Sequence, residues 1–126
     1  MNSNFEFLEG KWPLLASHGG AAEKYIYNDS NSCLIKSGLF GEAVVHLMLN
    51  SDGIPEPKED NTHANRIKIL KNEGLLPKDI DDILYALRIA RNKAAHDGYE
   101  STEQAMIFVE LAYKLGVWFM QTYGDS

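Results

Sequence analysis

The sequence predicts an all-α fold, a bundle of about five helices. Apolar residues recur at three- and four-residue spacing through most of the 126 residues, which is the period of an α-helix with one buried face. No stretch of useful length alternates with the two-residue period of a strand. Turn and capping residues separate the helical stretches. Together these observations indicate a small helical bundle without a β-sheet.

The first two predicted helices lie in the N-terminal half. Pro13 suits the first turn of a helix that continues to Ile26, and the glycine pair at 19–20 predicts a kink or a split in it. Turn and cap residues at 28–32 precede the second helix, over residues 33–50. That helix is apolar on more than one side, which predicts a central, buried position.

Three further helices follow a Pro-rich, charged loop at 54–60, which is expected to be mobile. The first is short, begins after Asn61 or Thr62 as a cap and stops near Gly74. Pro77 opens the second, which carries the motif discussed below. The third begins at Ser101, where a capping box with the residue three positions later is expected.

Composition bounds the functional class. A chain of 126 residues, 44% of them hydrophobic, suits one domain over residues 1–126. The formal charge of −6 opposes general binding to a phosphate backbone, so any nucleic-acid contact is expected to be local.

Nothing in the sequence indicates a metal, a cofactor or a membrane. The single cysteine, Cys33, has no second thiol to pair with. The four histidines lack the spacing that places two ligands on one helical face: His18, His46, His63 and His96. No leader and no run of roughly 20 apolar residues is apparent, so a soluble cytoplasmic protein is expected.

The stretch RNKAAHDG, residues 91–98, closes the helix that Pro77 opens. Winding that helix at roughly 100° per residue gives a core-facing stripe made of Ile80, Ile83, Leu84, Leu87, Ala90 and Ala94. Arg91 falls in the middle of this stripe. A guanidinium placed there needs a partner, because an unpaired buried charge is costly. Glu42 and Glu110 are the candidate partners.

The opposite side of the same helix carries Tyr85, Ile89, Asn92 and His96. Tyr85 and Ile89 form an apolar patch on a polar face, which suggests a homodimer interface. On an ideal helix Arg91 and His96 point roughly 140° apart. A loosening of the helix at 94–95 before a stop at 97–98 would reunite them, and so would a two-fold axis between two chains.

An Arg followed directly by Asn, and by His after four intervening residues, resembles the signature of the HEPN superfamily. The resemblance implies a HEPN-like helical domain, of a kind that includes dimeric, metal-independent endoribonucleases. Carried over to this chain, Arg91 would stabilise charge on the phosphorane and His96 would act as base or acid at the ribose 2′-hydroxyl. Asn92 would fill the polar position after the Arg. The structural alternatives are an ion pair for Arg91 and helix C-capping for His96.

A longer resemblance covers nearly the whole chain. The segments MNSNFEFLE, KYIYNDSNSCLIKSGLFGE, HANRIKILKNEGLLP and RNKAAHDGY resemble the N-terminal helical domain of type I restriction endonuclease R (motor) subunits. No glycine-rich phosphate loop with a Lys accompanies them. The resemblance implies a module of a longer restriction or helicase protein, or a stand-alone relative.

Two hypotheses follow. The preferred one is a non-catalytic module that forms homodimers or docks onto other domains or subunits of a restriction complex. The alternative is a metal-independent endoribonuclease that cuts single-stranded RNA with a composite Arg91/His96 site. The acidity of the chain and the place of Arg91 on the core stripe favour the first, and the match of Arg, Asn and His favours the second.

Overall fold

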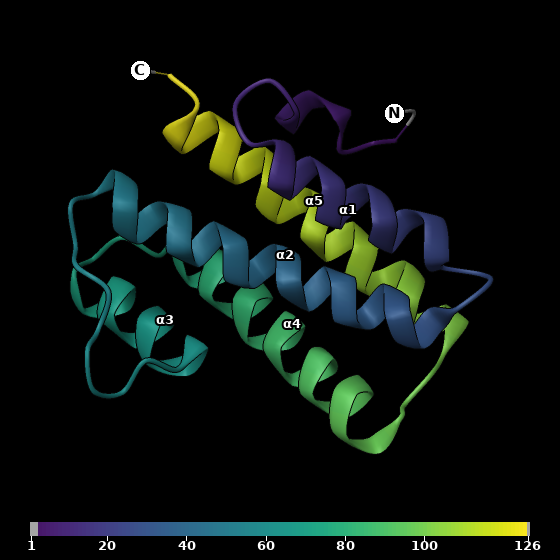
Figure 1. Ribbon diagram of the computed structural model, residues 1–126. Coiled ribbons are helices and arrows are strands. Elements are labelled where there is room, and N and C mark those ends of the chain that lie inside the picture. Colours follow the sequence, from purple (N-terminus) through teal and green to yellow (C-terminus); the bar gives the residue numbers. More distant parts are fainter. Residues whose placement is uncertain (1–2, 126) are drawn as a thin grey trace.

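A computed structural model describes residues 3–125. In chain order the elements are one 3-10 turn and five α-helices: η1 (Glu6–Leu8), α1 (Pro13–Tyr25), α2 (Ser30–Ser51), α3 (His63–Asn72), α4 (Lys78–Asp97) and α5 (Thr102–Tyr123). No strand occurs within the described range, so the predicted all-α bundle is confirmed (Figure 1).

Helix α2 lies at the centre of the bundle, as its sequence predicted. It contacts α1, α4 and α5 along its length and α3 more briefly (Figure 1). Its buried side chains point to several sides, and the fully buried ones are Cys33, Leu34, Phe40, Val44, Val45, Met48 and Leu49. A helix that buries so much of its circumference organises the rest of the fold around it.

By length and composition alone, helix α2 is also long and apolar enough to cross a membrane. The expectation of no run of roughly 20 apolar residues was therefore wrong. More than half of this apolar stretch is buried against the other helices of the bundle, as in a helix at the centre of a core.

The glycines of α1 do not break the helix. The prediction of a split at residues 19–20 is wrong, because α1 is continuous from Pro13 to Tyr25. Gly19 is buried directly beneath the ring of Phe5, and a Cβ at this position would collide with the ring atoms. The glycine therefore serves the packing of the N-terminal segment against α1.

Polar caps begin the later helices. The hydroxyls of Thr62 and Ser101 accept backbone hydrogen bonds at the starts of α3 and α5, as predicted. The second half of the expected capping box is absent from the described residues, because the N–H of Ser101 donates to the Oγ of Ser30, 2.9 Å away. A contact between distant helices thus replaces a local one.

The loop at 54–60 is attached to the bundle through one carboxylate. Glu56 lies between two helices, with Oε2 2.8 Å from His46 Nδ1 on α2 and Oε1 2.6 Å from Arg66 Nε on α3. The hydrogen bond from Arg66 is the main cause that lowers the pKa of Glu56, and the contact with His46 acts in the same direction. The side chain of Glu56 therefore holds the loop against both α2 and α3.

Candidate functional site

Helix α4 continues without a break through the motif. It ends at Asp97, and Gly98 adopts the left-handed conformation at φ 65° while its N–H donates to the carbonyl of Lys93. The predicted stop is confirmed, and a loosening at 94–95 is wrong, since both alanines are fully helical. Arg91 and His96 therefore remain on different sides of α4 within one chain.

Arg91 reaches α2, where it meets one of its two predicted partners. Its Nε lies 2.9 Å from Oε2 of Glu42, and the two side chains are 31% and 29% exposed. The buried N–H does not point at the carboxylate well enough for a hydrogen bond, so the contact is an ion pair by distance alone. Partial exposure makes this pair weaker than a fully buried one.

Gly38 allows that crossing. The stem of Arg91 lies directly over this glycine of α2, and a Cβ there would lie 2.8 Å from Cγ and Cδ of Arg91 and closer still to its Cβ. A glycine at this position therefore lets α4 approach α2 closely. Arg91 is thus fixed in place by the backbone of α2 beneath it as well as by Glu42.

Glu110, the other predicted partner, does not pair with Arg91. It is exposed on α5, and its carboxylate lies 3.5 Å from Nζ of Lys114, one turn further along the same helix. The prediction failed because the spacing of apolar residues in α5 does not show which of its polar positions face α4. Glu110 instead borders a shallow hollow between the start of the chain and α5.

The opposite face of α4 is open. Tyr85 is 59% exposed and Ile89 42% exposed, and the guanidinium of Arg88 lies over the Tyr85 ring at 5.3 Å from its centroid. His96 is exposed in the last turn, and Asn92 is half-buried. Within residues 3–125 neither of the two has a side-chain hydrogen bond. The four predicted residues thus lie along one face of α4, and Tyr85 at its start also borders α3.

Asn31, which sequence reasoning treated only as part of a cap cluster, fastens the end of α4. Its Nδ2 donates to the carbonyls of Ala94 and Tyr99, each at 2.8 Å. These bonds satisfy carbonyls that a helix end leaves without partners. The motif is therefore anchored to the start of α2, a contact between residues 63 and 68 positions apart that no local pattern could predict.

His63 lies partly buried at the start of α3. Its Nδ1 is buried and has no hydrogen-bond partner in the described part of the chain. Burial lowers its pKa to about 4, and the positive charges of Arg88, Arg66, His46 and Arg91 contribute in the same direction. The ring is therefore neutral at physiological pH and sits in a positive field.

The fold and these contacts define a small helical module whose conspicuous motif is split between a packed side and an open side. The chain belongs to the family described as a domain of unknown function (DUF4145), which matches residues 20–115. That range includes the whole of α2, α3 and α4 and therefore both sides of the motif.

The chain is also similar to the type I restriction enzyme EcoKI endonuclease subunit of Escherichia coli (strain K12). The two are 31% identical over 120 residues, which is 93% of this chain and 10% of that protein. The chain thus spans about one tenth of the length of that relative. No solved structure is significantly similar to it.

Proposed function

We propose that this chain is a non-catalytic helical module of a type I restriction system, with a HEPN-like bundle over residues 1–126 that acts in the cytoplasm. It serves by homodimerisation, or by docking onto other domains or subunits of the restriction complex. The contact surface is the open face of α4, which is defined by Tyr85, Ile89, Asn92 and His96.

The observation that carries this proposal is the separation of Arg91 from His96. Arg91 is engaged with Glu42 and lies over Gly38, and the continuous helix directs His96 away from it. General acid–base chemistry needs its groups within hydrogen-bond reach of one reacting centre. One chain alone therefore supports a packing role for Arg91 better than a catalytic one.

Similarity to a restriction endonuclease subunit supports the proposal that the chain acts in a type I restriction system. The matched region is nearly the whole chain and only a small part of the relative, as expected of a module that works attached to other parts. Exposed Tyr85 and Ile89 on one helical face provide the aromatic and aliphatic surface that interfaces favour.

Sedimentation equilibrium of the purified chain tests the interface. Ile89→Glu on α4 is compared with Leu14→Glu on α1, because Leu14 is also exposed, at 61%, and lies on a different helix. We expect wild type and Leu14→Glu to self-associate with the same Kd. The Kd of Ile89→Glu should be at least about tenfold higher, because the substitution would bury a charge in an apolar contact. Equal association of all three proteins would sink the homodimer form of the proposal.

The second candidate is the metal-independent endoribonuclease, and one observation favours it. His96 is exposed and Asn92 half-buried on the face proposed to meet a second copy, so a two-fold axis would bring them near the other protomer. His96 would take the proton of the 2′-hydroxyl as its oxygen attacks phosphorus, and the protonated His96 or a water molecule would donate a proton to the 5′-oxygen as its bond to phosphorus breaks. The products would be a 2′,3′-cyclic phosphate and a free 5′-hydroxyl.

Incubation with single-stranded RNA in EDTA distinguishes the two candidates. The docking proposal predicts no cleavage above a buffer control with any of several RNA sequences. Cleavage that leaves a cyclic phosphate, is lost in His96→Ala and persists in His18→Ala would establish the ribonuclease instead. The thermal melt of each variant shows that it is folded.

A further inference from the structure

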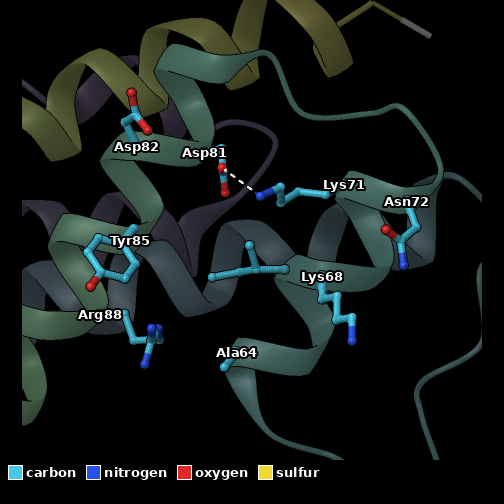
Figure 2. Close-up of a pocket in the computed structure, with 9 residues that line it drawn as sticks. Ala64, Lys68, Lys71, Asn72, Asp81, Asp82, Tyr85 and Arg88 are labelled. Atoms are coloured by element: carbon cyan, nitrogen blue, oxygen red, sulfur yellow. Dashed lines mark ion pairs between the residues drawn. The ribbon is translucent and has the colours of Figure 1, made fainter.

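The cleft between α3 and α4 is a second candidate binding site, separate from the motif. It measures about 590 Å³ and is lined by Ala64, Ile67, Lys68, Lys71, Asn72, Asp81, Asp82, Tyr85 and Arg88. Figure 2 shows α3 and α4 lining opposite sides of it, with Lys68 and Lys71 from α3 and Tyr85 and Arg88 from α4.

The charges in this cleft do not cancel. Lys71 lies 3.2 Å from Asp81, and Asp82 lies 3.1 Å from Lys78, so each aspartate already has a cation of its own. Within residues 3–125 neither Lys68 nor Arg88 has an acidic partner, and the two stand on opposite walls. The cleft therefore carries local positive charge on a protein whose formal charge is −6.

The lining of the cleft adds an apolar component. It includes Ala64 and Ile67 of α3 and the exposed ring of Tyr85, which lies beneath the guanidinium of Arg88. Such a site suits a ligand with an apolar side chain between negative groups. The neighbouring His63 supports the sign of the field, because Arg88 and Arg66 both act to lower its pKa.

We propose that the α3–α4 cleft docks an acidic peptide segment of a partner protein, with an apolar side chain on Ala64 and Ile67 and flanking carboxylates on Lys68 and Arg88. A peptide suits the cleft better than a nucleic-acid strand does. Two uncompensated cations match one or two isolated carboxylates, whereas a continuous phosphate backbone would also run past Asp81 and Asp82 and an acidic surface.

A random library of ten-residue peptides, selected on immobilised full-length chain, tests this inference. We expect peptides selected on wild type to be enriched in Asp and Glu next to Leu, Ile or Phe. Selection on the double charge reversal Lys68→Glu/Arg88→Glu should favour Lys and Arg instead. Lys114→Glu on α5 is the matched control, because it changes an exposed lysine outside the cleft, and its selected peptides should match those of wild type.

NMR and affinity measurements with the selected peptide then test where it binds and which charges hold it. The best acidic peptide should shift backbone amide NMR signals of α3 and α4, and its Kd should rise about tenfold or more in Lys68→Ala/Arg88→Ala, which should melt near wild type. No acidic enrichment, an unchanged preference in the reversed variant, or tighter binding of a ten-nucleotide single strand at the same amides would overturn the inference. Ile89 lies outside the cleft lining, so a failed self-association test and a failed cleft test are distinguishable.

Discussion

The two faces of α4 differ in what holds them. On the packed face, Arg91 lies over Gly38 and pairs with Glu42, and the apolar stripe around it is closed by α2 and α5. On the open face, Tyr85 and Ile89 are exposed and His96 has no partner within residues 3–125. One face of α4 is therefore covered by other helices, and the opposite face is exposed.

This difference shows why a motif in sequence need not be a site in one chain. Arg91 and His96 are five positions apart, and a continuous helix separates them by roughly 140° around its axis. Residues on the packed face should therefore affect folding stability, and residues on the open face should affect association.

The largest effect is expected from adding one methyl group beneath Arg91. Gly38→Ala should lower the free energy of unfolding by about 2 to 3 kcal/mol, because the new Cβ would collide with the Cβ of Arg91, which cannot move without α4. Gly41→Ala, three residues along α2, is the control. Its Cβ would lie 3.4 Å from Leu87 Cδ1, an ordinary contact, and helix propensity should make it neutral or stabilising by up to about 1 kcal/mol. Urea unfolding of both variants that gave equal losses would refute the close crossing.

His63 predicts a dependence of stability on pH. Its pKa is about 4 in the folded protein and near 6.5 in the unfolded chain, so the unfolded state binds more protons between these values. Stability should therefore fall as the pH drops from 6.5 to 4, by about 2 kcal/mol after allowance for partial exposure of the ring. His63→Gln should be less sensitive over this window while keeping the steeper losses that carboxylates cause at lower pH. Chemical unfolding at half-unit steps measures the difference, and identical profiles would show that His63 titrates normally.

Asn31 links the packed face to the end of α4. Asn31→Ala should cost about 1 to 2 kcal/mol, because the carbonyls of Ala94 and Tyr99 lose their donor in a partly buried place. Asn28→Ala, in the exposed turn before α2, should change stability by less than about 0.5 kcal/mol. Amide hydrogen exchange of residues 94–99 should also accelerate in Asn31→Ala, and no local acceleration would contradict the anchoring role.

The smallest effect is expected from the ion pair itself. A double-mutant cycle with Arg91→Met and Glu42→Gln should give a coupling of about 1 kcal/mol, well below the roughly 3 to 5 kcal/mol lost when a fully buried pair is broken. The exposed pair of Glu110 and Lys114 should couple by about 0.3 kcal/mol, as such pairs on a helix surface do. A coupling no larger at Arg91 than at Glu110 would mean that Gly38 alone fixes the arginine.

Most of the fold could be predicted from local patterns. The apolar stripe of α4 is confirmed, with Ile83 half-buried against the core and the others buried: Ile80, Leu84, Leu87, Ala90 and Ala94. The stops at Gly74 and Gly98 are confirmed too, each at positive φ. These features depend on helical periodicity and backbone sterics, which a short stretch of sequence contains.

The remaining features depend on which residues meet across the bundle. Glu42 was one of two candidates for Arg91, and only the packing of α4 on α2 distinguishes it from Glu110. The bonds of Asn31 to the end of α4 and of Ser30 to Ser101 join residues more than sixty positions apart. The cleft between α3 and α4 likewise exists only once two helices lie together, so a single sequence carries no local signal for it.

Sedimentation equilibrium of Arg91→Met and Ile89→Glu tests most directly whether α4 has one face for packing and another for self-association. The two residues are only two positions apart in sequence and lie on opposite faces of the helix. We expect Arg91→Met to self-associate with the Kd of wild type at a temperature where it remains folded. The Kd of Ile89→Glu should be at least about tenfold higher. Loss of association in Arg91→Met with full association in Ile89→Glu would contradict this division of α4.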